Sequence, residues 1–149
     1  MLLRRGLSAY RATEAQVWVP YCLALLGRGC EIAGQIEESS TMLDEALQIA
    51  ESTGERWLAA ELNRHKGQLL WRQQHSEAAE EFYGKVLNIA KMQEAKLFEL
   101  RASTSLARLW REQGRRDAAR DLLAPTYGWF TEGFDTPVLK EAKALLDDL

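Results

Sequence analysis

Residues 67–92 read GQLLWRQQHSEAAEEFYGKVLNIAKM. When the chain is shifted against itself by 40 places, residues of the same kind come into register with this stretch from either side. Small residues recur at Gly27, Gly67 and Ala107 and at Ser39, Ala79 and Ala119; large apolar residues recur at Leu43, Tyr83 and Leu123, at Trp18, Leu58, Phe98 and Val138, and at Ile49, Ile89 and Trp129. Such a fixed period is typical of stacked repeats. We therefore expect the small residues where helix backbones approach closely, and the large apolar residues in the core.

Within each unit the apolar residues follow helical spacing. Leu43, Ala46, Leu47 and Ala50 lie at positions i, i+3, i+4 and i+7, and no segment alternates as a strand would. The pattern predicts helices near 1–12, 15–33, 36–53, 56–73, 75–93, 95–113, 115–130 and 137–148. Connections this short make successive helices antiparallel neighbours. The predicted fold class is all-α, an antiparallel helical-hairpin solenoid of about 3.5 repeats and 8 helices.

Residues that tolerate a left-handed backbone recur where the first helix of each unit ends, at Gly34, Gln74 and Gly114. The last helix has Val138, Ala142 and Leu145 on one side and charges elsewhere, as in a helix that caps a solenoid. The boundaries that follow divide one domain, 1–149, into a half repeat (1–13), repeat 1 (14–53), repeat 2 (54–93), repeat 3 (94–133) and a capping helix (134–149).

Gly67, Ala79, Tyr83 and Val86 resemble the signature of the tetratricopeptide family, although the unit exceeds that family's usual 34 residues. The longer unit is similar to the helical tails of bacterial signal-transduction ATPases and ATPase-containing nucleotide cyclases, most specifically over 103–149; HEAT-like repeats are the alternative. The resemblance implies a non-catalytic scaffold in signal transduction. The ATPase or cyclase chemistry would lie elsewhere, because no glycine-rich phosphate loop ending in Gly-Lys-Ser/Thr occurs here.

Composition excludes several other classes. The net charge of -3, from 19 basic and 22 acidic residues, argues against a nucleic-acid partner. No apolar run approaches the roughly 20 residues of a membrane-spanning helix. The two cysteines, Cys22 and Cys30, are too few for a disulfide scaffold, which indicates a cytoplasmic location.

We find no constellation that would support catalysis. His65 and His75 are ten residues apart and have no evident second group, and Cys22 and Cys30 align with core positions of other units. The sequence therefore predicts no catalytic residue, no cofactor and no metal. The third hypothesis for the function is an enzyme or a domain that binds a small effector.

The first helices carry the basic charge: residues 56–73 have a net +3 and residues 95–113 a net +2. The resemblance implies that first helices line a concave groove, and its partner-binding positions fall on Tyr21, Arg28, Glu61, Arg64, Gln68, Trp71, Arg72, Arg101, Arg108 and Arg111. Guanidinium groups suit carboxylates, and tryptophan supplies an apolar anchor. We predict that this groove binds an acidic peptide or a neighbouring domain. The alternative is a solvated face whose arginines pair with Glu61 and Glu112.

A further reading concerns the start of the chain. Residues 1–13 align with the second helix of a unit whose first helix is absent, which suggests either the tail of a longer array or pairing with another copy through residues 1–12. In the second case Leu2, Leu3 and Leu7 would complete their packing in a homodimer.

Overall fold

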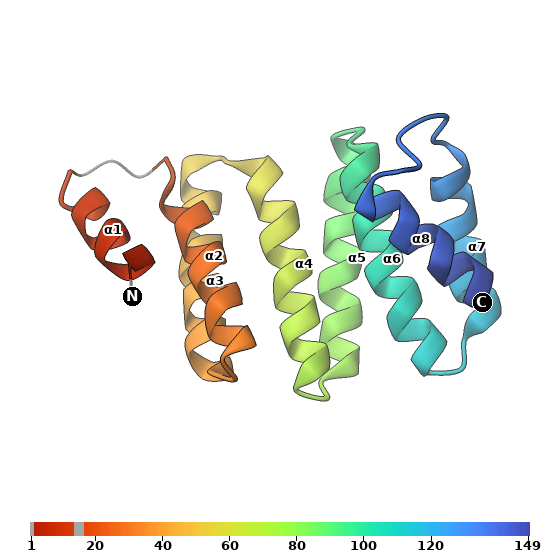
Figure 1. Ribbon diagram of the computed structural model, residues 1–149, viewed down its shortest axis with the longest axis horizontal. Coiled ribbons are helices and arrows are strands. Elements are labelled where there is room, and N and C mark those ends of the chain that lie inside the picture. Colours follow the sequence, from red (N-terminus) through yellow and green to blue (C-terminus); the bar gives the residue numbers. More distant parts are fainter. Residues whose placement is uncertain (1, 14–16) are drawn as a thin grey trace. The chain divides into compact units, whose positions relative to one another are not determined.

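The computed structural model describes residues 2–13 and 17–149, and all regular structure within them is α-helical. Eight helices follow one another: α1 (Leu2–Arg11), α2 (Val19–Ile32), α3 (Ile36–Thr53), α4 (Arg56–Arg72), α5 (Ser76–Met92), α6 (Lys96–Glu112), α7 (Arg116–Gly128) and α8 (Pro137–Asp148) (Figure 1). They pack as sequential hairpins, which confirms the predicted fold class. The chain forms two compact units, Met1–Leu69 and Leu70–Leu149, and each is described by itself.

The predicted helix ends are confirmed. Gly34, Gln74 and Gly114 have φ angles of 77°, 67° and 78°, all in the left-handed region. In each case the next residue's N–H donates to a carbonyl five residues earlier, as from Gln35 to Cys30 at 2.8 Å and from His75 to Leu70 at 2.9 Å. This bond satisfies a carbonyl that the helix end would otherwise leave unpaired. Gln74 therefore performs the function of glycine in the middle repeat.

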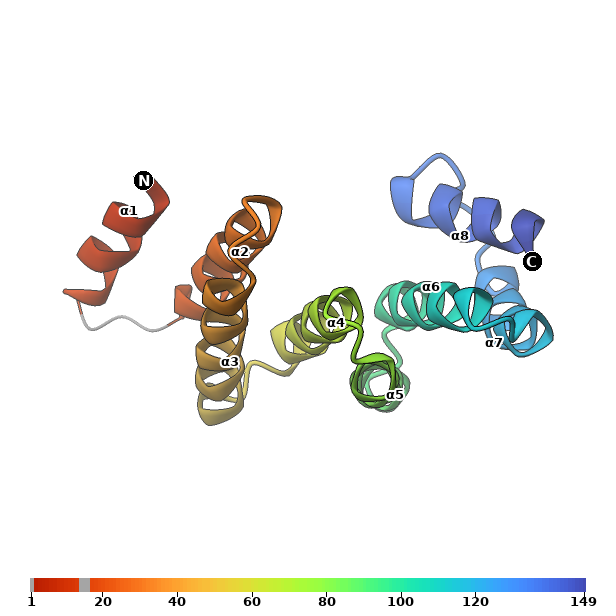
Figure 2. The ribbon, with the colours of Figure 1, turned by 90° about the horizontal axis from the view of Figure 1, so that it is seen from below.

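In the first unit, the antiparallel helices α2 and α3 pack against each other (Figure 2). Leu23 of α2, Leu43 of α3 and Leu62 of α4 (Arg56–Arg72) are buried in one cluster. Gly27 faces α3 so closely that a Cβ atom there would lie 3.4 Å from the Ser39 carbonyl oxygen. Ser39 is itself fully buried. The predicted close approach of backbones at these two small residues is confirmed.

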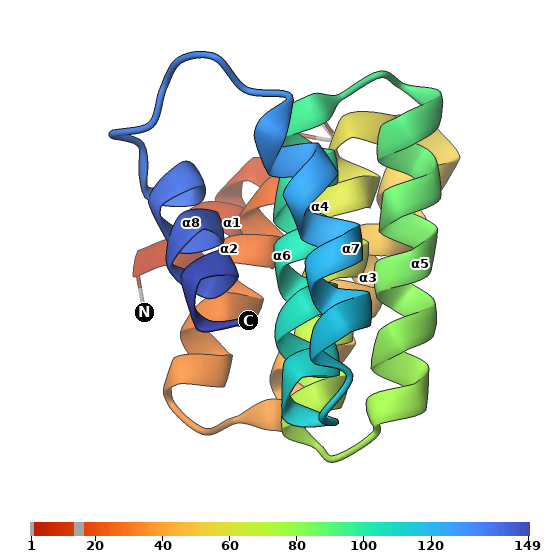
Figure 3. The same cartoon turned by 90° about the vertical axis from the view of Figure 1, so that its right-hand side faces the viewer.

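In the second unit, α6 contacts α5, α7 and α8 (Figure 3). Leu100, Leu123 and Leu145 are buried in one cluster, and α8 contributes Leu139 and Ala142 as well. The buried side of α8 explains why its outer side is charged, as the sequence predicted for a capping helix.

Two predicted core positions are wrong. Trp18 is 55% exposed, although the equivalent Leu58 is buried. Trp129 is 58% exposed, although the equivalent Ile49 and Ile89 are half-buried. Trp18 immediately precedes α2, which begins at Val19 because Pro20 occupies its first turn, rather than at residue 15. Trp129 lies at the end of α7, beside Phe130. Helix ends thus place both indoles outside the packed interior.

Candidate functional site

The predicted basic face of the second unit lies on α6, where α8 runs alongside it. Arg108 Nη2 lies 3.3 Å from Glu141 Oε2, and Arg111 Nη1 lies 2.6 Å from Asp148 Oδ2. Both pairs are exposed, and such pairs stabilise a fold by only about 0–1 kcal/mol. Both arginines are therefore already paired with carboxylates of another helix. Exchanging these carboxylates for those of a partner would cost little free energy. These contacts go to α8 rather than to Glu112, the partner expected from sequence.

The remaining predicted residues of this unit differ in exposure. Arg101 on α6 is half-buried, as is Trp71 near the end of α4, whereas Arg72 is exposed. Trp71 thus offers only part of its ring as an apolar anchor.

In the first unit, Glu61, Arg64 and His65 form a polar cluster on α4. Arg64 donates from Nε and Nη2 to the two Glu61 oxygens at 3.0 and 2.7 Å, and His65 Nε2 lies 3.3 Å from Glu61 Oε1. The three side chains are only 13–16% exposed. Burial alone would raise the pKa of Glu61, but hydrogen bonds from His65 and Arg64 outweigh it and hold the pKa well below its usual value.

We expect Glu61→Gln to lower the free energy of unfolding at pH 7 by about 1–3 kcal/mol, because Arg64 would lose its charged partner. The folded-state pKa of Glu61 is depressed, so its carboxylate stabilises the fold above the ordinary value of 4.5 and loses that effect as pH falls below it. Urea unfolding at pH 7 and pH 3 measures both. The control Glu51→Gln makes the same charge change at an exposed position of α3. A deficit that persists undiminished at pH 3 would contradict this assignment.

The two predicted residues on α2 share its solvent side. Tyr21 is 43% exposed and meets the Trp18 ring edge-on at 6.2 Å between centroids. Arg28 is exposed, as is Gln68 on α4. This face of α2 is thus more apolar than the corresponding face of α6.

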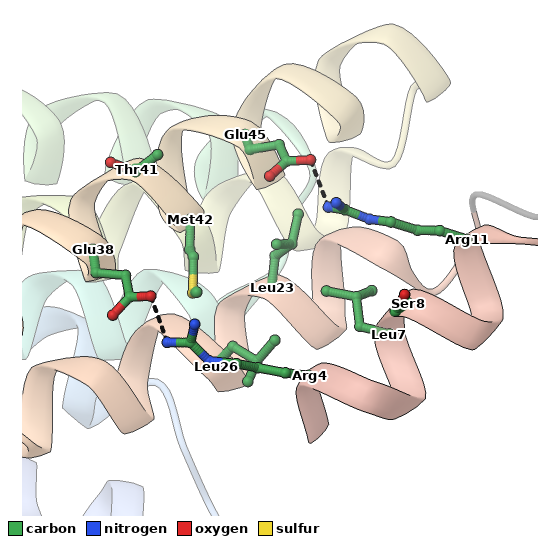
Figure 4. A pocket seen from close by; sticks show the side chains of 10 residues that line it. All are labelled: Arg4, Leu7, Ser8, Arg11, Leu23, Leu26, Glu38, Thr41, Met42 and Glu45. Atoms are coloured by element: carbon green, nitrogen blue, oxygen red, sulfur yellow. Dashed lines mark hydrogen bonds and ion pairs between the residues drawn. The ribbon is translucent and has the colours of Figure 1, made fainter. Parts of the chain in front are cut away.

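A pocket of about 420 Å³ lies between α1, α2 and α3 (Figure 4). Two ion pairs, Arg4–Glu38 and Arg11–Glu45, each 2.5 Å long, connect α1 with α3 beside it. Two of the leucines expected to pair with another copy differ in exposure. Leu7 is buried within its own chain, whereas Leu2 is 87% exposed. Leu3's side chain lies outside the described part.

Sequence reasoning missed three participants. His65 has a second group after all, because Glu61 lies one turn away, a spacing that a helix brings together. The ion pairs of Arg4 and Arg11 follow no local sequence pattern, because each arginine lies 34 residues before its partner.

Within residues 2–13 and 17–149, no cluster of three histidine, cysteine or acidic side chains is arranged to hold a metal ion. In the same part of the chain, no helix has the length and apolarity needed to span a membrane.

A family model described as tetratricopeptide repeat matches residues 19–92, which contain α2 to α5. Residues 19–92 therefore contain tetratricopeptide repeats, and the chain has a tetratricopeptide-like repeat fold. Tetratricopeptide-repeat domains are generally non-catalytic and generally bind proteins or peptides, which agrees with the predicted class of function.

Solved structures share the repeat architecture. BtubC (BKLC) from P. vanneervenii matches with a TM-score of 0.76 and 15% identity, covering 99% of this chain and 68% of that one. Nearly identical TPR-like repeats assigned to a kinesin light chain of Podosopora anserina match with a TM-score of 0.65 and 18% identity, covering 99% and 81%. Identities this low concern the fold alone.

No curated protein sequence matches this chain. The matches reported above do not link it to an ATPase or a cyclase, so that context stays a proposal.

Proposed function

We propose that this protein binds an acidic peptide segment, or an acidic surface of a neighbouring domain, through Arg108 and Arg111 of α6. The observation that supports the proposal most directly is the pairing of Arg108 and Arg111 with Glu141 and Asp148. Both arginines present their guanidinium groups to carboxylates carried by a helix. The biological setting we propose is a regulatory or scaffolding tail in a bacterial signalling ATPase or cyclase.

The exchange of carboxylates is the physical basis of this proposal. Both internal pairs are solvent-exposed, with side chains between 31% and 60% exposed. A partner that brings several carboxylates at once replaces weak single pairs by a charge-assisted network. Because the contacts are exposed, salt should weaken the binding. Glu141 and Asp148 act as internal competitors for the same arginines.

The test uses a fluorescein-labelled peptide of alternating glutamate and alanine, with its glutamine counterpart as the uncharged probe. Fluorescence anisotropy should show binding of the glutamate peptide, lost by about tenfold or more in Arg108→Ala/Arg111→Ala. The control Arg5→Ala/Arg120→Ala removes the same charge from exposed positions on α1 and α7.

A second arm removes the internal competitors. Glu141→Gln/Asp148→Asn should bind the glutamate peptide more tightly than the wild type, because Arg108 and Arg111 are then unoccupied. Equal losses in the two arginine double variants, or equal binding of the glutamine peptide, would overturn the proposal.

A further inference from the structure

Helix α2 has a second apolar face, opposite the one it buries. Its buried residues include Val19, Leu23, Leu26, Gly27 and Cys30. The other face, which we call the α2 stripe, consists of Trp18, Tyr21, Leu25, Arg28 and Ile32, and its four apolar members are 55%, 43%, 41% and 81% exposed. Two aromatic and two aliphatic side chains gathered on one exposed helix face are typical of an interaction site rather than of scattered surface residues.

The spacing of the α2 stripe favours another helix as its occupant. The five positions are separated by three, four, three and four residues. This alternation places them in one narrow row along α2, as in the seam where two helices pack side by side. An extended peptide would not follow such a row.

The α2 stripe is also self-complementary. When a second copy of α2 is laid antiparallel and centred on Leu25, each Leu25 meets its own counterpart. Trp18 then faces Ile32 of the second copy, and Tyr21 faces Arg28 of the second copy. An arginine over a tyrosine ring is a favourable cation–π pair. A twofold axis makes each of these contacts twice.

Two further observations suit this pairing. A Cβ atom added to Gly29, adjacent to Arg28, would meet nothing within 4 Å, so the Tyr21 ring of a second copy has space there. Within residues 2–13 and 17–149 Arg28 forms no ion pair, and the only other charged residue of α2 is Glu31. An acidic peptide would meet only one cation on the α2 stripe. A second copy, by contrast, places an apolar side chain opposite Trp18 and Ile32 and an aromatic ring opposite Arg28.

We propose that the chain forms a homodimer through antiparallel packing of two α2 stripes. This places self-association on α2 rather than on residues 1–12. It is independent of peptide binding by Arg108 and Arg111, because those residues belong to α6. The twofold axis passes beside Leu25, and this position provides the sharpest test.

The experiment compares Leu25→Glu, Leu25→Lys and their equimolar mixture by light scattering after size exclusion, at about 200 µM because a small interface binds weakly. We expect the wild type to approach twice its 16.9 kDa mass. Each variant places like charges across the axis and should raise the dissociation constant at least about tenfold. The mixture should recover the dimer, since glutamate then faces lysine.

The matched control substitutes Met92, which is 83% exposed at the end of α5, by glutamate or lysine; these variants should dimerise like the wild type. Thermal melting verifies that all variants are folded. A monomeric wild type, single variants that stay dimeric, or a mixture that stays monomeric would each overturn the proposal. A monomeric wild type would indicate instead that the α2 stripe binds a helix of a different protein.

Discussion

Replacing Leu123 by alanine is expected to lower the free energy of unfolding by about 2–5 kcal/mol. Leu123 is fully buried on α7, among Leu100 of α6 and Leu139 and Leu145 of α8. Removing three carbons at this point leaves a cavity shared by three helices, which cannot all move inward together. Urea unfolding followed by circular dichroism measures the loss.

Leu97→Ala is the matched control for this substitution. It removes the same atoms from α6 of the same unit, but Leu97 is 47% exposed and its side chain is already partly hydrated. We expect a change within about 0.5 kcal/mol. Equal effects at the two positions would show that Leu123 does not lie in the core.

Gly27→Leu should destabilise the fold by about 3 kcal/mol, through forced separation of α2 and α3. The glycine Cα faces the Ser39 carbonyl and the Leu43 side chain, and a Cβ atom alone would already approach them at 3.4 and 3.6 Å. The further three carbons of leucine have no space unless the helices move apart. Chemical denaturation again provides the measurement.

Gly29→Leu makes the same exchange two residues later in α2, where a Cβ atom meets nothing within 4 Å. Leucine has the higher helix propensity, so this variant should be neutral or more stable by up to about 1 kcal/mol. The difference between the two variants then isolates packing from propensity. A loss at residue 29 as large as that at residue 27 would contradict the packing account.

Most of the fold was predictable from the sequence because the repeat imposes one local rule several times. A residue such as Gln74 is a poor candidate for a left-handed backbone by itself, but its register with Gly34 and Gly114 identified it correctly. The same register identified Leu43, Tyr83 and Leu123 as buried. Register predicts burial less well at helix ends, where Trp18 and Trp129 are exposed although their counterparts Leu58 and Ile89 are buried and half-buried.

The candidate site was predictable only in part, because its pairs join residues far apart in sequence. Arg108 contacts Glu141 because α8 packs against α6. No local sequence pattern encodes which residues of the two helices meet. Arg4 meets Glu38 because α1 lies beside α3. The Glu61–His65 contact, by contrast, is a spacing of four residues on one helix and was readable in advance.

The account depends on two-helix modules that repeat every 40 residues and present variable faces on a constant core. A crystal structure of the chain tests it most directly, by superposing residues 36–53 on 76–93 and on 116–133. We predict that Leu43, Tyr83 and Leu123 coincide as buried residues facing the preceding helix. Modules that superpose only after a different shift, or that place these three side chains in solvent, would contradict the account.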